Sequence, residues 1–485
     1  MADQTAWPAG YPAGDDGPAS PLAVTGLFAG VFDHGTAATG DAAWFQALLQ
    51  AEAGLARALE RAGRAPAGSG AAVTEAATVN GFSAAEVAEV ARASALTGNP
   101  VPGLARVLAR RVPDFAAPAV HQGATSQDIM DTAAMLLARS SLEAAARDVA
   151  AAAEAAARLA REHAGTLMIG RTLLQQAVPV TFGLVAAGWL DGLDSGAAGL
   201  AVASRRLAVQ FGGAAGTLAS LGADGPRVAA LLGQELGLAV PPLPWHTERL
   251  RVIDVAMALA RVTATLGKIA RDVILLAQSE VGEASEGGEG GGGAGGPRRG
   301  GSSAMPNKAN PVASVAILGC ARQVPGLLAT LVASAEHEHQ RAAGAWHAEW
   351  EPFTAVLRLA GSAAAWGAEL LGDLRVDPAR MAANLAATGG LPLAERVTGL
   401  LAGALGRPAA HDLVAGAAAR AVAAGRPLRE ELLGLPEVGQ AGITAGQVDE
   451  ALDPAGYVGA AARFTAAALR AHEEQLACAG GREPR

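Results

Sequence analysis

The chain has 485 residues, of which 51% are hydrophobic but only 4% aromatic, so alanine, leucine and valine must form the core. This composition favours long helices packed through small side chains over a sandwich or barrel, which needs more β-branched and aromatic residues. The formal net charge of −9 comes without a basic stripe, which argues against nucleic acid as the main partner.

Cysteine usage and the start of the chain predict a cytoplasmic protein. The two cysteines, Cys320 and Cys478, are too few for a disulfide framework and are not spaced like metal ligands. The start, Met1-Ala-Asp-Gln, lacks the basic and apolar regions of a secretory signal. Residues 177–190, read as the most apolar uncharged stretch, are too short to span a bilayer, so no membrane partner is expected.

The apolar periodicity predicts helices throughout. Residues 1–40 are rich in Pro, Gly, Ala and Asp, which is typical of a partly disordered lead-in. Asp41 should cap an amphipathic helix that Gly63 ends, followed by short helices to about residue 117. Very long helical patterns then cover residues 126–163, 179–207, 246–283 and 306–337. Helices of such length indicate a bundle.

We therefore expect an all-α fold of three helical domains. The predicted domains are residues 1–117 with the lead-in, the long-helix bundle 118–371, and a helical cap domain 372–485 in which Pro and Gly return. The pattern of residues 252–276 is apolar nearly all round, and one chain cannot easily bury four such helices. The sequence thus predicts a homo-oligomer built on the long helices.

Four segments carry residues suited to chemistry on a small anion. They are Thr97-Gly-Asn-Pro-Val-Pro102, His121-Gln-Gly-Ala-Thr-Ser-Gln-Asp128, Gly170-Arg-Thr-Leu-Leu-Gln-Gln176, and a glycine-rich stretch from Glu286 that ends in Gly301-Ser-Ser-Ala-Met-Pro-Asn-Lys-Ala-Asn-Pro311. The first reads as a turn between helices. In the second, Thr125 or Ser126 can cap a helix, whose free N–H groups bind carboxylates.

The last segment predicts a mobile lid over an active site. Lys308 is one of two lysines among 37 cationic residues, and a compact ammonium approaches an anion in a way that arginine does not. Pro306 suits the first turn of a helix, which would place Lys308 and Asn310 at its positive end beside Ser302 and Ser303.

Each segment also has a simple structural explanation. Thr-Ser can be only a cap, His121 a structural histidine, Gln175 an interhelical hydrogen bond, and a glycine run a linker. What favours an active site is the joint occurrence of Ser-Ser, Met-Pro, Lys and Asn-Pro in one register.

The run Gly301–Pro311 resembles the signature of the fumarase/aspartase superfamily, and His121–Asp128 and Gly170–Gln176 resemble two further active-site segments of it. Gly170–Gln176, with residues 210–218 and 245–249, is most similar to the 3-carboxy-cis,cis-muconate cycloisomerase branch. The resemblance covers roughly residues 20–475. It implies a homotetramer on a central bundle, active sites shared by three subunits, and no metal or other cofactor.

The resemblance also implies roles for single residues. Ser302 would be the base that removes a proton next to a carboxylate, and Lys308 and Asn310 would hold that carboxylate as it becomes a dianion. A hydroxyl is a poor base, so it would need lid amides, a helix N-terminus and the ammonium in a dry site. The candidates for substrate contact are Thr125, Ser126, Gln175, His121, Ser303, Met305 and Asn99. Arg171, Arg249 and Arg251 are weaker candidates that could equally form interhelical salt bridges.

Two departures from the superfamily pattern narrow the reaction. Leu173 and Leu174 stand where lyases that expel an amine or a nucleotide carry a histidine acid, which is worth on the order of two to four powers of ten. Adenylosuccinate and argininosuccinate are therefore poor candidates. Two reactions need no such acid: the addition of a carboxylate to its own double bond, and the loss of a leaving group that is already a stable anion.

The lid separates these two reactions. Related cycloisomerases have His-Lys-Arg where this chain has Asn307-Lys308-Ala309, and fewer cations suit a substrate with fewer carboxylates. We expect a succinate-type dicarboxylate, nitrosuccinate, split into fumarate and nitrite in bacterial diazo biosynthesis. The alternative is lactonisation of 3-carboxy-cis,cis-muconate in protocatechuate degradation.

Two other classes of function are weaker. A purely structural role, which this scaffold has in the lens, would not require Ser302, Lys308 and Asn310 to stay together. Metal catalysis has no convincing ligand set: His337 and His339 would face different sides of a helix, and with His347 they are expected at the surface.

Overall fold

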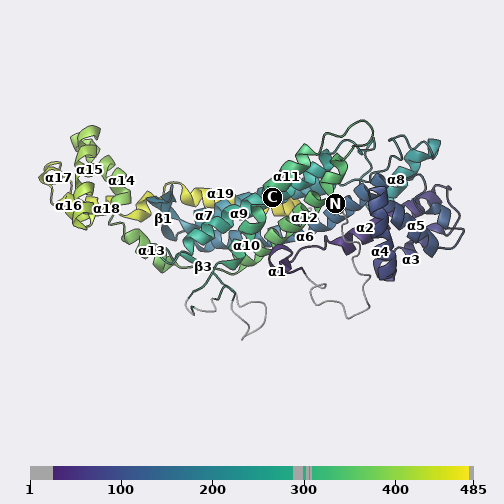
Figure 1. Ribbon diagram of the computed structural model, residues 1–485. Coiled ribbons are helices and arrows are strands. Elements are labelled where there is room, and N and C mark those ends of the chain that lie inside the picture. Colours follow the sequence, from purple (N-terminus) through teal and green to yellow (C-terminus); the bar gives the residue numbers. More distant parts are fainter. Residues whose placement is uncertain (1–25, 288–298, 302–304, 306–307, 480–485) are drawn as a thin grey trace, which may run out of the picture.

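The computed structural model describes residues 26–287, 299–301, 305 and 308–479. Figure 1 shows an elongated molecule with long helices in the middle and smaller helical parts at both ends. The all-α prediction is confirmed to the extent that the described residues are mostly helical, and two small antiparallel sheets of two strands each accompany the helices.

The N-terminal part consists of short helices packed around α2. The helices here are α1 (Ala29–Phe32), α2 (Asp41–Arg61), α3 (Ser69–Ala76), α4 (Ala84–Thr97) and α5 (Val101–Arg111). The predicted helix is present, but Asp41 is not its cap: Gly40 is the N-cap and Asp41 is the first residue of α2. Gly63, at φ +74°, ends the helix, because its left-handed backbone turns the chain and lets Arg64 N–H donate to Leu59 O.

The long helices form the central bundle. They are α6 (Ser126–Glu162), α7 (Phe182–Arg205), α9 (Leu250–Leu276) and α12 (Ala345–Gly372), with α8 (Gly225–Leu236) beside α2. The 37 residues of α6 make it about 55 Å long at 1.5 Å per residue. Ala152, Ala156 and Ala160 are fully buried along it, so small side chains do allow the close packing that the composition predicted.

Two of the predicted long helices are wrong in part. Residues 167–181 form a hairpin of β1 (Leu167–Thr172) and β2 (Gln175–Thr181), and α7 starts only after Thr181, whose hydroxyl accepts from Leu184 N–H. Residues 306–337 hold α10 (Val312–Ala321) and α11 (Val324–Ala333). Pro325 lies in the first turn of α11, where its missing N–H costs nothing, and this favours a new helix start.

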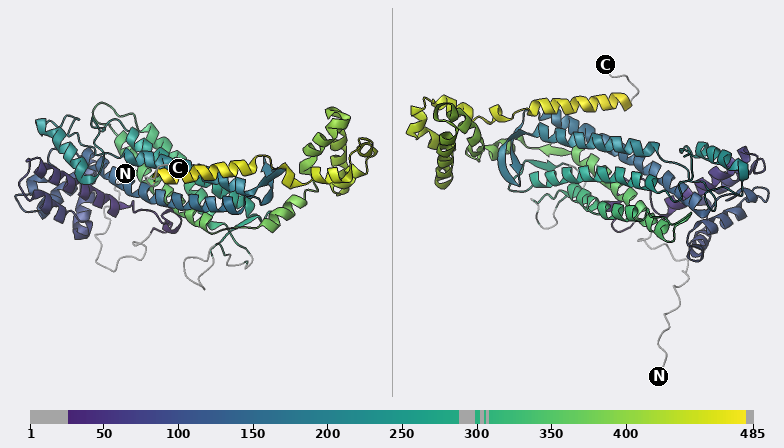
Figure 2. Two further views of the ribbon diagram at one scale, coloured as in Figure 1. Left: turned by 180° about the vertical axis from the view of Figure 1, so that it is seen from behind. Right: turned by 90° about the horizontal axis from the view of Figure 1, so that it is seen from above.

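The C-terminal part divides into a small helical cluster and a helix that returns to the bundle. The cluster includes α14 (Ala394–Leu405), α15 (Arg407–Ala424), α16 (Leu428–Leu433), α17 (Pro436–Gln440) and α18 (Ala445–Ala451), and it has its own apolar core. It is reached through β4 (Leu374–Val376), which pairs with β3 (Ala284–Glu286), and α13 (Pro378–Ala386). Figure 2 shows α19 (Ala461–Ala479) lying along the bundle.

The domain boundaries at 117 and 371 stay a prediction. The apolar core of residues 397–451 is separate, whereas the N-terminal helices and the bundle share one continuous core. In addition, α19 contacts α7, with His472 Nδ1 at 2.9 Å from Asp194 Oδ1, although it falls inside the predicted cap domain.

Residues 312–333 are the one helical run in the described part of the chain that is long and apolar enough to cross a membrane. Residues 177–190, the stretch considered from the sequence, are divided between β2 and the start of α7. A single run of this kind is weak evidence for a membrane, since a core helix of a soluble protein can be equally long and apolar. Only 28% of the most apolar part of this run is buried, and Val315 and Val332 are 57% and 48% exposed. This chain therefore leaves an apolar surface uncovered.

Candidate active site

The prediction that Thr125 or Ser126 caps a helix is confirmed. Thr125 is the N-cap of α6 and Ser126 its first residue, and both are half-buried. The backbone N–H of Thr125 donates to Asp128 Oδ2 at 3.0 Å, which fixes the chain at the point where it enters the helix.

Asp128 joins this helix start to a second loop. Its Oδ1 accepts from Gln210 Nε2 at 2.9 Å and from Gly212 N–H at 3.0 Å, while Oδ2 also accepts from Gly213 N–H at 2.8 Å. Burial raises the pKa of Asp128 to about 6, and the hydrogen bonds from Thr125, Gln210, Gly213 and Gly212 partly oppose that rise. Four donors on one carboxylate indicate the ionised form at neutral pH.

We expect Asp128→Asn to destabilise the protein by about 1–3 kcal/mol for each donor that loses its acceptor. The new amide NH2 group would face two N–H donors. These are the N–H groups of Thr125 and Gly213 if it takes the place of Oδ2, or the two donors to Oδ1 if it takes the place of Oδ1. Urea unfolding at pH 7 measures this, with the exposed Asp114→Asn as control. Because the folded pKa lies above the ordinary value, the free-energy cost of ionising buried Asp128 builds up as pH rises from the ordinary pKa to about 6 and stays constant at higher pH. A stabilised variant would mean that this burial cost outweighs the hydrogen bonds.

His121 lies just before the cap, on a buried carboxylate. Its backbone has φ +58°, its N–H donates to Glu52 Oε2 at 2.9 Å, and its Nδ1 lies 2.7 Å from Glu52 Oε1. Glu52 comes from α2 and is fully buried, whereas the His121 side chain is 24% exposed. The His121 side chain therefore stays partly accessible, a few residues before the start of α6.

The third segment forms the β1–β2 hairpin. Arg171 makes a fork to Glu283, with NH1 to Oε2 at 2.7 Å and NH2 to Oε1 at 2.8 Å, so its guanidinium already has a carboxylate partner. Gln175 is exposed at the start of β2. Leu173 and Leu174 form the turn at φ +52° and +64° and are 96% and 72% exposed.

The ends of the lid are held together. Asn310 N–H and Nδ2 both donate to Gly300 O, at 2.9 and 3.1 Å. Gly300 has φ +78°, and a Cβ there would lie 2.1 Å from Asn310 O, so only glycine fits. Arg299 NH2 lies 2.5 Å from Glu369 Oε2 on α12, which fixes the first end of the lid on the bundle.

The predicted place of Lys308 and Asn310 in the first turn of a helix is wrong. Both precede α10, whose N-cap is Pro311. The N–H groups of Ala313 and Ser314 donate to Glu286 Oε2 and Oε1 at 3.0 and 2.8 Å. A carboxylate of the chain itself thus occupies the helix N-terminus that was expected to stabilise the serine base.

The two lid serines, Ser302 and Ser303, together with Pro306 and Asn307, lie outside the described residues. Met305 and Lys308 are exposed, and Lys308 N–H donates to Met305 O at 3.0 Å. The lid ammonium thus lies at the surface of the single chain.

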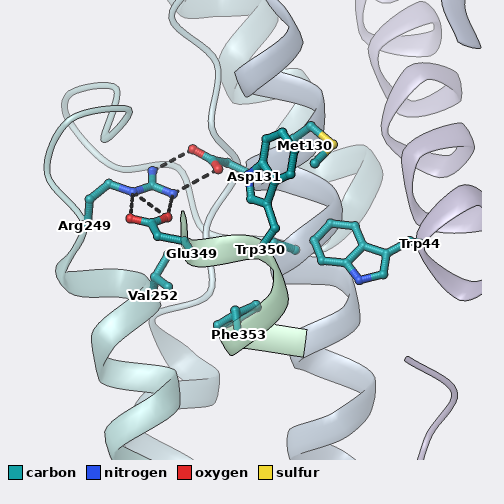
Figure 3. A pocket seen from close by; sticks show the side chains of 9 residues that line it. Trp44, Met130, Asp131, Arg249, Val252, Glu349, Trp350 and Phe353 are labelled. Carbon is teal, nitrogen blue, oxygen red and sulfur yellow. Dashed lines mark hydrogen bonds and ion pairs between the residues drawn. The ribbon is translucent and has the colours of Figure 1, made fainter. Parts of the chain in front are cut away.

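Two candidates have local or buried partners. Asn99 lies in the predicted turn between α4 and α5, where its Oδ1 accepts from Val101 N–H at 3.1 Å. Arg249 is 3% exposed and pairs with Asp131 and Glu349 at 2.6 Å each (Figure 3). The cavity beside it has about 10 Å³ of free space, hardly room for one water. This favours the salt-bridge alternative for Arg249.

The remaining arginine candidate and the histidines also have defined places. Arg251 NH1 donates to Arg206 O at 2.7 Å. The prediction of a surface His337 on a helix is wrong: its side chain is fully buried, 3.3 Å from Glu349, in a segment between α11 and α12. His339 and His347 are exposed as expected. Among the described residues, no group of three or more His, Cys, Asp or Glu is placed to hold a metal ion.

The three predicted active-site segments lie apart in one chain. Thr125 begins α6, whereas the hairpin follows the other end of that helix, about 55 Å away. In Figure 1 the hairpin lies toward the C-terminal cluster, and β3 and α10, which flank the lid, lie between it and α2. An open groove of about 1,010 Å³ runs beside the hairpin, lined among others by Arg171, Leu174, Lys268 and Tyr457.

The sequence reading missed the carboxylates that hold these segments. Glu52 holds His121, Asp128 holds the start of α6, Glu283 holds Arg171, and Glu286 holds the start of α10. The available signal was an acidic residue inside an apolar stretch, as for Glu52 between Ala51 and Ala53.

A bundle of long helices that carries these segments defines a helical lyase. Residues 33–326 match the family model described as "Lyase", and residues 390–468 match the one described as "Adenylosuccinate lyase C-terminus". The chain belongs to this lyase family, the fumarase/aspartase superfamily, in its branch of 3-carboxy-cis,cis-muconate cycloisomerase-like proteins.

Two curated relatives are about equally similar in sequence. A 3-carboxy-cis,cis-muconate cycloisomerase of Bradyrhizobium diazoefficiens is 45% identical over 70% of this chain and 74% of its own. A nitrosuccinate lyase of Streptomyces davaonensis is 44% identical over 88% of this chain and 90% of its own. The crystal structure of a 3-carboxy-cis,cis-muconate lactonizing enzyme from Pseudomonas putida has a TM-score of 0.84 and 38% identity, and covers 93% of this chain and 99% of that one.

Proposed function

We propose that this lyase eliminates nitrite from nitrosuccinate and releases fumarate. The observation that carries the proposal is the hairpin turn, where Leu173 and Leu174 offer no proton to a leaving group. Nitrite departs as a stable anion and needs none. The similarity to the Streptomyces davaonensis nitrosuccinate lyase extends over nearly the whole chain and supports this substrate.

The proposed chemistry uses the lid and the start of α6. Ser302 takes the proton from the carbon next to one carboxylate, and Lys308 and Asn310 hold that carboxylate while negative charge builds on it. Thr125, Ser126, His121 and Gln175 orient the rest of the substrate, and Ser303, Met305 and Asn99 border it. Arg249 is left out, because its guanidinium is paired within the chain.

We further propose that the active form is a homotetramer. The segments that should meet around one substrate lie about a helix length apart, so other copies must supply the missing ones. The uncovered apolar face of α10 and α11 gives such copies a surface to bury. Free thiols at Cys320 and Cys478 suit the proposed cytoplasmic location.

The test of the reaction gives the protein nitrosuccinate and 3-carboxy-cis,cis-muconate in parallel and follows nitrite, fumarate and lactone. We expect nitrite and fumarate in equal amounts. Lactone without nitrite would instead establish the cycloisomerase, the second candidate, which the identity to the Bradyrhizobium diazoefficiens enzyme favours. That result would also mean that Asn307 and Ala309, which stand where related cycloisomerases have His and Arg, do not reduce the number of substrate carboxylates that the site binds.

A further inference from the structure

Glu52 is a buried carboxylate whose two oxygens both bind one residue. It lies within an apolar stretch of α2 and is fully buried. Oε2 accepts from the backbone N–H of His121 at 2.9 Å, and Oε1 lies 2.7 Å from His121 Nδ1. A buried carboxylate is costly unless a positive partner compensates it, so this geometry favours the protonated ring.

The rest of the His121 geometry leaves one donor for a ligand. With Nδ1 directed at Glu52, Nε2 is the ring nitrogen left over, and it makes no hydrogen bond to any of the described residues. The backbone of His121 is left-handed, at φ +58°, a strained state that tends to occur at functional sites. Its carbonyl accepts from Ala124 N–H at 3.3 Å, so a turn connects His121 directly to the start of α6.

We infer that Glu52 is a positioning residue that holds His121 as an imidazolium, whose Nε2–H donates to an oxyanion of the substrate. The inference rests on the proposed function and names what stabilises the charge of the departing group. The accepting oxygens belong either to the nitro group, which gains negative charge as it leaves as nitrite, or to the carboxylate on the same carbon.

The electron and proton balance requires no transfer from His121. The C–H pair forms the double bond of fumarate, the C–N pair leaves with nitrite, and Ser302 takes the proton. An imidazolium that donates a hydrogen bond and keeps its proton suits this step, because the charge on the leaving oxygens grows as the bond breaks. It also agrees with the hairpin turn, where Leu173 and Leu174 offer no proton to the leaving group.

The carboxylates around His121 favour its cationic form. Burial lowers the pKa of His121, but the hydrogen bond and charge of Glu52 from α2, with the charge of Asp128 from α6, outweigh it and raise the pKa above its ordinary value. The cation is therefore present below the raised pKa and is lost as pH rises through it.

Calorimetry tests the inference without relying on turnover. Fumarate is titrated into the protein at several pH values from about 6.5 to 9, and nitrite is then titrated into the fumarate complex. We expect one of the two affinities to fall by at least about tenfold as pH rises, the effect of one charge-assisted hydrogen bond. A fall for fumarate identifies the carboxylate as the acceptor, and a fall for nitrite identifies the leaving group.

Three variants make the result specific. Glu52→Gln keeps the shape but removes the charge, so the fall should move to lower pH. His121→Asn, which tolerates a left-handed backbone, should bind at least about tenfold more weakly without the pH dependence, and it replaces Glu52→Gln if that variant does not fold. Glu60→Gln, also on α2 and holding the N–H groups of Gly68 and Gly70, should behave like the unchanged protein.

The inference is overturned if neither ligand shows a pH dependence that these variants change, or if neither binds. The proposed function is judged separately by nitrite release. Nitrite release with unshifted binding in Glu52→Gln would reject the inference alone, and shifted binding without nitrite release would reject the nitrosuccinate proposal alone.

Discussion

Replacing Ser302 with alanine should lower kcat for nitrite release by at least about a hundredfold, because a general base contributes on the order of two to four powers of ten. The melting temperature should stay unchanged, since the variant removes one oxygen. Steady-state kinetics with nitrosuccinate and a thermal melt measure the two effects. If turnover stays within about a factor of ten while the fold is intact, Ser302 is not the base.

Ser303→Ala is the matched comparison. It removes the same oxygen one residue away and should raise KM more than it lowers kcat, because Ser303 is proposed to bind substrate without taking a proton. Equal losses of kcat in both variants would indicate that the lid as a whole, rather than one hydroxyl, was damaged.

The serine variant also tests the shared active site. Mixed tetramers of Ser302→Ala and Thr125→Val should regain about one quarter of the sites when the lid and the α6 start come from different subunits. The reason is that one copy then supplies the intact lid and another the intact helix start. A mixture that stays inactive after unfolding and joint refolding would place both segments in the same subunit.

Arg249→Met should destabilise the protein by about 3–5 kcal/mol at neutral pH, because it leaves two buried carboxylates without their cation. In the structure NH1 lies 2.6 Å from Asp131 Oδ2, and NH2 lies 2.6 Å from Glu349 Oε2, with both carboxylate side chains only 5% exposed. Denaturant unfolding at neutral pH measures the loss.

The pH dependence of that loss has a defined sign. Burial raises the pKa of Glu349, but its contacts with His337 and Arg249 outweigh this and hold the pKa below the ordinary value. Its stabilising effect is therefore present above the unfolded pKa and lost as pH falls, so the difference between Arg249→Met and the unchanged protein should shrink in acid. Arg429→Met, which breaks an exposed pair with Asp449, should leave the unfolding midpoint nearly unchanged. If Arg249→Met destabilised the protein as little as Arg429→Met, this would mean that water reaches the ion pairs of Arg249.

Some local features follow from the sequence alone. Asp41 and Gly63 bound α2, Thr125 caps α6, and Asn99 lies in a turn, because caps and turns depend on a few neighbouring residues. The lid signature was also sufficient to identify the superfamily, since its residues are consecutive.

The hairpin and the start of α10 were decided by tertiary packing. Residues 175–181 are too short and apolar for periodicity to separate a strand from the helix that follows, and β1 is needed to pair with them. Glu286 reaches the start of α10 from 27 and 28 positions away. No local pattern shows such a partner.

The candidate site shows the same division most clearly. The residue types at Ser302, Lys308, Thr125 and His121 predicted carboxylate chemistry from the sequence. The carboxylates that hold the candidate residues became evident only in the fold, because Glu52 lies 69 positions from His121, and Glu283 lies 112 positions from Arg171. Local propensity acts over one or two turns, whereas a buried charge must find its partner wherever the packed core brings one within hydrogen-bond distance.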